Sequence, residues 1–145
     1  MAKLVIVSLL VLASSLAASA VSVEYCNKKA NYAVSVSSVD IIPNPVIPGK
    51  LATFNISAST DKSITGGKMI IDVNYFFIHV DQETHDLCEG TSCPATGNFA
   101  MVHQRELPSY TPPGSYTITM KMQDSEGKLL TCIRFGFSIG LVSDS

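Results

Sequence analysis

Charge is scarce in this sequence of 145 residues, and basic residues are not clustered. Charged residues make up 15% of the chain, and the formal net charge is −2. The pair Lys28-Lys29 is the longest basic run. Because proteins that bind nucleic acid present a basic surface to its phosphates, we predict no nucleic-acid partner.

The signatures of common catalytic sites are also missing. The sequence contains no Gly-x-Ser-x-Gly elbow, no His-Glu-x-x-His pair, no phosphate-binding loop and no dinucleotide fingerprint. We therefore predict that the protein is not an enzyme, has no catalytic residue and uses no cofactor.

The first twenty residues contain the three parts of a secretory signal. Lys3 supplies a short basic start, residues 4–12 are apolar, and Ala18-Ser19-Ala20 forms a small-residue end. A membrane anchor is the alternative, but the apolar part is shorter than the roughly 20 residues that span a bilayer. We predict a signal peptide at residues 1–20, entry into the secretory pathway, and one domain at residues 21–145.

All four cysteines lie in the predicted mature chain. An oxidising compartment favours two disulfides from an even count, and four cysteines allow three pairings. We favour Cys88–Cys93, which closes a tight loop, and Cys26–Cys132, which ties the start of the domain to its last strand.

Two kinds of metal site can be considered, and both fit the spacing poorly. A zinc site would add His85 and His103 to the cysteines, yet there is no Cys-x-x-Cys pair and the compartment favours oxidation. Residues 81–86 have the residue types of a calcium site or of acid–base catalysis, but they match no calcium loop. We interpret them as solvated charges and predict no metal.

A period of two dominates the mature chain, and no stretch keeps a helical stripe for three turns. The polar residues 81–93 are predicted to form a loop. About seven short strands with regular turn signals favour an all-β fold, an immunoglobulin-like β-sandwich. The main runs are 33–39, 50–59, 68–80, 98–107, 114–123 and 129–141.

The run 50–59 alternates strictly, with Phe54 and Ile56 on its apolar face and Asn55 on its polar face. Asn55-Ile56-Ser57 is an N-glycosylation sequon. A glycan on the polar face would not disturb the core, so we predict glycosylation at Asn55, with an unmodified chance sequon as the alternative.

The predicted interior is rich in methionine, and the chain has no tryptophan. Methionine is flexible and fills irregular gaps, so it suits either an ordinary dry core or an adaptable ligand cavity. Periodicity cannot reveal a cavity, and composition alone favours the dry core. The inward residues in question are Phe54, Met69, Phe99, Met101, Tyr116, Met120, Met122, Phe135 and Phe137.

Several motifs occur in an order that resembles a known family. They are Cys26, the Cys88–Cys93-Pro94 loop, Pro112-Pro113-Gly114-Ser115-Tyr116 and the late Cys132-Ile133. Over residues 23–139 the chain resembles the ML lipid-recognition domain family. That family includes the Niemann-Pick type C sterol carrier, an endotoxin-binding co-receptor and the phosphatidylglycerol/phosphatidylinositol transfer proteins. The Pro-Pro-Gly-x-Tyr run and residues 46–50 are most similar to its plant members.

The resemblance implies a sandwich whose sheets splay apart to hold one lipid in an apolar cavity, without enzymatic activity. It also supports the two favoured disulfides and a glycan near Asn55. Sterol-carrying animal members have a third bridge where residues 41–50 here lack cysteine, and Met120 and Ile133 replace tryptophans of the sterol tunnel. The cavity is therefore expected to be wider or differently shaped.

The implied function is to carry or transfer a single sterol or phospholipid between membranes, as a monomer with transient membrane contact. The expected location is extracellular, in the apoplast, or lumenal, in the vacuole or endoplasmic reticulum. The alternative is a lipid-sensing module that presents lipid to a receptor. Expected portal residues are Phe77, Val80, Leu87 and Tyr110. Expected interior lipid-binding residues are Phe54, Met69, Ile71, Val73, Tyr75, Phe99, Met101, Ile118, Met120, Met122, Ile133 and Phe135.

Overall fold

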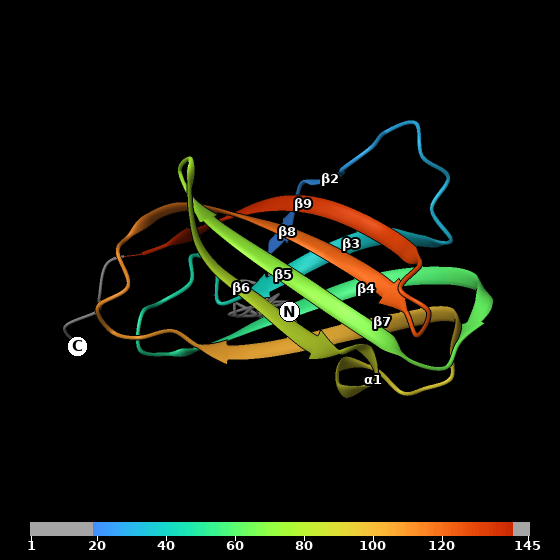
Figure 1. Cartoon of the computed structure of the whole chain (residues 1–145). Coiled ribbons are helices and arrows are strands. Elements are labelled where there is room, and N and C mark those ends of the chain that lie inside the picture. Colours follow the sequence, from blue (N-terminus) through green and yellow to red (C-terminus); the bar gives the residue numbers. More distant parts are fainter. Residues whose placement is uncertain (1–18, 141–145) are drawn as a thin grey trace, which may run out of the picture.

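The computed structural model describes residues 19–140, which form nine strands and one short helix (Figure 1). The helix, α1 (Leu87–Gly90), is one turn long, and no helix among these residues has the length and apolar character to cross a membrane. The strands are β1 (Ser19–Val21), β2 (Val23–Tyr25), β3 (Val34–Ile42), β4 (Leu51–Ile64), β5 (Gly67–Tyr75), β6 (Ile78–Asp86), β7 (Ala95–Glu106), β8 (Gly114–Asp124) and β9 (Leu129–Ile139).

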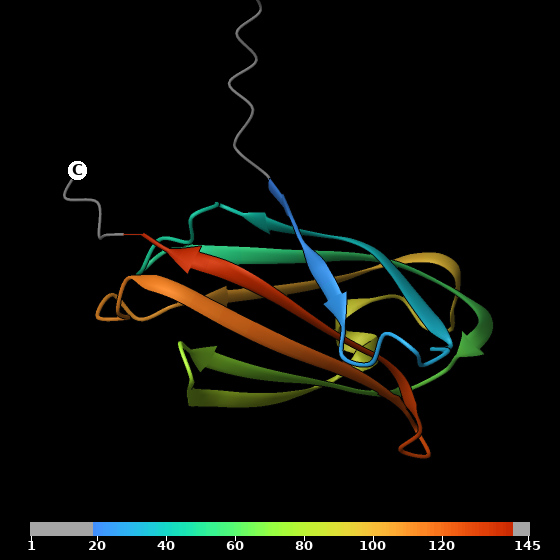
Figure 2. The same cartoon turned by 90° about the horizontal axis from the view of Figure 1, so that it is seen from above.

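The strands form two antiparallel sheets that pack as a sandwich, which confirms the predicted fold class (Figure 2). One sheet has the order β1-β3-β4-β7 and the other β2-β9-β8-β5-β6. In β4 the expected alternation is observed, since Ala52, Phe54, Ile56 and Ala58 are buried. The apolar faces of both sheets meet in one core.

One edge of the sandwich is closed by the chain itself. β1 pairs with β3 of the first sheet, and β2, one residue later, pairs with β9 of the second (Figure 2). Cys26 follows β2 and is bonded to Cys132 of β9, with their Cα atoms 5.4 Å apart. The backbone therefore passes from one sheet to the other along this edge, and the disulfide fixes the end of β2 to β9 within the second sheet.

At the opposite edge the chain crosses between the sheets at one end, through residues 87–94, which join β6 to β7. Its outer strands are β6 in one sheet and β7 in the other, and their ladder partners within residues 19–140 are β5 and β4 respectively. Along the two strands themselves, side chains fill the space between β6 and β7. We call this side of the molecule the open edge.

The polar segment after residue 80 differs from its prediction. Residues 68–80 do not form one strand but split at a turn containing Phe76, whose φ is 54°, and β6 then continues to Asp86 where a loop was expected. Its half-buried positions are Asp81, Glu83 and His85. Because the inner face of this strand is polar, its period-two pattern carries no apolar signal.

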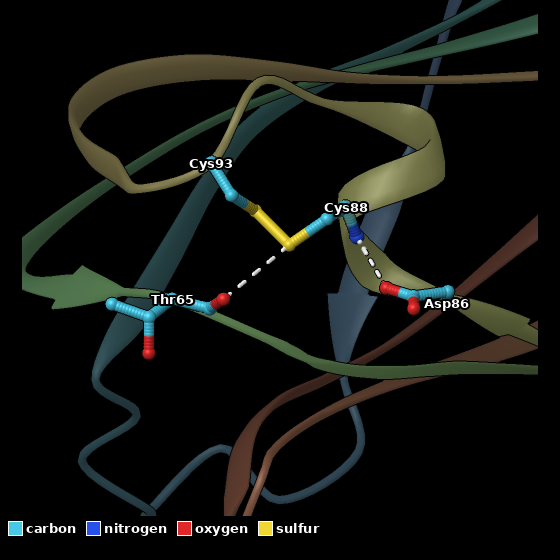
Figure 3. The surroundings of a disulfide bond; sticks show 4 residues. All are labelled: Thr65, Asp86, Cys88 and Cys93. Carbon is cyan, nitrogen blue, oxygen red and sulfur yellow. Dashed lines mark hydrogen bonds between the residues drawn. A yellow bond between two sulfur atoms is a disulfide. The ribbon is translucent and has the colours of Figure 1, made fainter.

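The segment after β6 is organised around the second disulfide (Figure 3). Asp86 caps α1, with its Oδ1 accepting a hydrogen bond from the backbone N–H of Cys88 at 2.9 Å. Cys88 is bonded to Cys93, and its Sγ lies 3.8 Å from the carbonyl oxygen of Thr65. The structure thus contains both predicted disulfides. Leu87, expected at a portal, is instead fully buried beneath this turn.

Candidate functional site

A cavity of about 250 Å³ lies between the two sheets. Its wall is mostly apolar because every second residue of β4, β5, β8 and β9 points inward. Both sheets contribute, so the cavity belongs to the sandwich core and not to a surface loop. The apolar wall consists of Phe54, Ile56, Met69, Ile71, Val73, Tyr116, Ile118, Met120, Phe135, Phe137 and Ile139.

The cavity reaches the surface at one end of the sandwich. Val80 of β6 and Pro108, which follows β7, both line it and are both exposed. The β5–β6 turn and the connection from β7 to β8 meet here, since the Tyr75 hydroxyl donates a hydrogen bond to the Pro113 carbonyl at 3.0 Å. We call this end the mouth.

Large apolar side chains project into solvent around the mouth. Phe77 is 102% exposed, Tyr110 85%, Ile78 65% and Phe76 63%. With Val80 at 49%, four of these residues lie in the β5–β6 turn or at the start of β6, and Tyr110 lies in the connection from β7 to β8. We call these five residues the mouth patch. Exposed apolar clusters of this kind mark surfaces that contact a membrane or another molecule.

A charged group crosses the open edge beside the cavity. Arg105 of β7 donates a hydrogen bond from Nη1 to Asp81 Oδ2 of β6 at 2.9 Å, and it also pairs with Glu83 Oε1. All three residues line the cavity. Burial alone would lower the pKa of Arg105, but its hydrogen bonds to Glu83 and Asp81 outweigh this and raise it. The guanidinium is therefore permanently charged.

Two histidines lie on the other side of Glu83. Its Oε2 is 3.6 Å from Nε2 of His103 and 3.7 Å from Nε2 of His85, and the two imidazole rings are 4.7 Å apart. Burial is the main cause that lowers the pKa of His103, and the neighbouring His85 adds to it, while Glu83 opposes the shift. His103 is thus held neutral at neutral pH.

The structure places the expected interior residues in two groups. Those at the cavity wall are Phe54, Met69, Ile71, Val73, Ile118, Met120 and Phe135, together with the expected portal residue Val80. Those that pack in the core or beside it without lining this cavity are Tyr75, Phe99, Met101, Met122 and Ile133. Phe99 borders a separate hollow next to the Cys88–Cys93 loop. The portal residues Phe77 and Tyr110 lie at the mouth.

Several wall residues were not expected from the sequence. Ile56 shares the alternation of Phe54 and could have been found by that signal. The polar wall residues Asp81, Glu83, His103 and Arg105 could not, because they come from two strands that pair with different partners. Asn55, the sequon residue, is half-buried on the outer face of β4, opposite Asp40 and Val102.

Comparisons with known proteins agree with this architecture. The family model for the ML domain matches residues 20–139. A phosphatidylglycerol/phosphatidylinositol transfer protein of Aspergillus oryzae is 32% identical over 118 residues, covering 77% of this chain and 67% of that protein. The protein of the same name from Aspergillus fumigatus is 31% identical over 116 residues, covering 75% and 66% respectively. The chain therefore matches about two thirds of these relatives' length.

Solved structures share the fold at low identity. A Niemann-Pick type C2 protein from the Japanese carpenter ant has a TM-score of 0.64 at 13% identity, covering 82% of this chain and 99% of that one. Chicken MD-1 complexed with lipid IVa has a TM-score of 0.51 at 18% identity, covering 80% and 87%. The family resemblance predicted from the cysteine order and the Pro-Pro-Gly-x-Tyr run is confirmed. With a family model that spans nearly all of the described residues, the chain belongs to the ML domain family.

Proposed function

We propose that this protein binds a single lipid between its two sheets and transfers it between membranes, without chemical change to the lipid. The observation that carries the proposal is the apolar cavity that runs from the core to the mouth, where Phe77 and Tyr110 stand in solvent. Burial of an acyl chain is favourable by about 0.8 kcal/mol per methylene. The names of the two fungal relatives support a phospholipid as the first candidate, with a sterol as the second.

The cavity must enlarge to take a whole lipid. Its volume of about 250 Å³ is below the roughly 300–1,000 Å³ of most small-molecule sites. Along the open edge β6 and β7 are joined by side-chain ion pairs and not by a backbone ladder, so we expect the sheets to separate there. Methionines such as Met69 and Met120 adapt to a changing wall because their side chains are flexible.

The mouth patch is the surface proposed to touch the membrane. Its aromatic and aliphatic tips can enter the interface between headgroups and acyl chains, while the rest of the protein remains in water. A lipid could then move along an apolar path from the bilayer into the cavity. The polar headgroup would stay near the mouth, close to Val80 and Pro108.

We further propose a signal peptide, a cellular location and a glycan for this protein. The predicted signal peptide falls outside the described residues except for Ser19 and Ala20, which lie in β1. Cleavage after Ala20 would remove two of the three residues of β1 and leave β2 intact. We place the protein in the secretory pathway as a monomer, with the apoplast, vacuole or endoplasmic reticulum lumen as destinations, and with a glycan at Asn55. Two disulfides support an oxidising compartment.

The proposal can be tested by a transfer assay with purified protein. Donor vesicles carry fluorescent phosphatidylglycerol or phosphatidylinositol, acceptor vesicles carry none, and the protein is present at far below one molecule per lipid. We expect repeated turnover, and lipid that co-purifies with the secreted protein should be identified by mass spectrometry. Absence of both bound lipid and transfer would contradict the proposal. Stable capture of a receptor ectodomain without transfer would favour a lipid-presenting module instead.

A further inference from the structure

Lipid binding leaves one part of the cavity wall unexplained. Glu83 and His85 of β6 and His103 of β7 meet at the open edge, although an apolar ligand needs none of them. Glu83 and His85 are two residues apart on an edge strand, so both point toward the space between the sheets. His103 reaches the same point from the facing edge strand.

The three side chains offer their donor atoms to a common centre. One ring nitrogen of His85, one ring nitrogen of His103 and a carboxylate oxygen of Glu83 all lie within 4.8 Å of one another. The two distances from Glu83 Oε2 are 3.7 Å to His85 and 3.6 Å to His103. Ligands about 2.1 Å from a tetrahedral zinc ion are about 3.4 Å apart. Small rotations of these side chains would therefore give metal-binding geometry.

Both imidazoles present an atom that lacks a partner. Nε2 of His85 and Nε2 of His103 are buried and receive or donate no hydrogen bond within residues 19–140. Buried polar atoms are normally paired, so each such atom calls for an explanation. The third histidine differs, because His79 Nε2 lies 3.2 Å from Asp72 Oδ1. An unprotonated Nε2 has the lone pair that a metal ion uses.

The surrounding charge selects a cation over an anion. Arg105 occupies Oε1 of Glu83 and contacts Asp81, which leaves Oε2 of Glu83 directed toward the histidines. The two carboxylates, Asp81 and Glu83, exceed the single guanidinium of Arg105 by one negative charge. A phosphate or carboxylate ligand at this point would be repelled, whereas a divalent cation would be attracted.

We propose that Glu83, His85 and His103 form a binding site for a divalent transition metal of the zinc class. Two imidazole nitrogens and one carboxylate oxygen suit Zn²⁺, and three protein ligands leave a fourth position for water. Ca²⁺ and Mg²⁺ prefer sets made only of oxygen, so they fit this site poorly. Because Glu83 and His85 belong to one sheet and His103 to the other, the metal would also join the two sheets across the open edge.

The site can be tested without any assumption about lipids. Untagged, metal-stripped protein is titrated with ZnCl₂ by calorimetry, and we expect saturable binding near one ion per chain. His85→Gln and His103→Gln should each weaken the affinity at least about tenfold. His79→Gln is the matched control, since it removes a histidine beside a carboxylate within one sheet, and it should bind as the parent does. MgCl₂ and CaCl₂ should give no comparable binding.

A second measurement avoids reliance on the variants. In the parent protein, the imidazole nitrogen NMR signals of His85 and His103 should shift together on addition of ZnCl₂, while those of His79 stay in place. The melting temperature should rise with Zn²⁺ in the parent and in His79→Gln only. Zinc binding that is equally strong in His85→Gln and His103→Gln, or zinc-induced shifts confined to His79, would overturn the proposal. Loss of lipid transfer would not bear on it.

Discussion

Arg105 and Asp81 form an ion pair that bridges two strands belonging to different sheets. The distance from Arg105 Nη1 to Asp81 Oδ2 is 2.9 Å, and the residues are 24 positions apart in sequence. Their side chains are 36% and 40% exposed. Exposed pairs of this kind contribute only about 0.2–1 kcal/mol. The contact thus links β6 to β7 and is weak enough to break when the sheets separate.

Asp81→Asn is expected to ease this separation. The loss of one charge should lower the free energy of unfolding by no more than about 1 kcal/mol and should speed lipid uptake, followed by stopped-flow fluorescence. Asp72→Asn is the matched control, because Asp72 pairs with His79 within one sheet and not across the open edge. Equal uptake rates for parent, Asp81→Asn and Asp72→Asn would show that the open edge does not govern entry.

Met120→Trp and Met122→Trp should have different effects, because one residue lines the cavity and the other lies in the packed core. Both methionines point inward from β8, but only Met120 is part of the cavity wall. Met120→Trp should fill space that a lipid would occupy, so it should reduce lipid binding while the delipidated protein keeps its melting temperature. Met122→Trp should overpack a filled region and cost about 1–3 kcal/mol.

These two variants are compared by thermal melting of delipidated protein and by fluorescent-lipid displacement. A melting temperature that falls for Met120→Trp, with lipid binding unchanged, would contradict the assignment of Met120 to the lipid cavity.

The two disulfides should differ in their effect on stability. Cys26–Cys132 spans 106 residues and Cys88–Cys93 spans 5. The chain-entropy model gives about 4–5 kcal/mol for the long loop and about 2 kcal/mol for the short one. Cys132→Ser, which also frees the end of β2 from β9, should therefore reduce the yield of secreted protein more than Cys88→Ser. Equal yields, measured by immunoblot of the medium and cell fractions, would argue against this ranking.

Phe77→Ser should impair membrane contact without harming the fold. Phe77 is fully exposed, so its loss should change the free energy of unfolding by less than about 0.5 kcal/mol. Transfer between vesicles should slow, and binding to vesicles should weaken in a flotation assay. Leu129→Ser is the control, because Leu129 is 40% exposed at the start of β9, at the end of β8–β9 opposite the mouth. A similar loss of transfer in both variants would contradict a membrane role specific to the mouth patch.

The sequence determined much of the sandwich by local rules. Strict alternation in 50–59 predicted the strand that became β4, and the runs 114–123 and 129–141 predicted β8 and β9. The oxidising context and the loop lengths favoured the two disulfides that the structure contains. These features are local or depend on one strong chemical constraint, so a single sequence carries them. β1 and β2 were missed because three residues each give too short a pattern to recognise.

The position of the cavity and the polar residues beside it were decided by the tertiary structure. Residues 81–85 look like a solvated loop in sequence, yet they pair with β5 as an edge strand, and Asp81 and Glu83 on its inner face meet Arg105 and His103 of β7. Met120 and Met122 share one inward face, and the separation of the sheets places only the first at the cavity. Periodicity gives the direction of a side chain. What that side chain meets is decided by the distance between two sheets, which depends on contacts far apart in the chain.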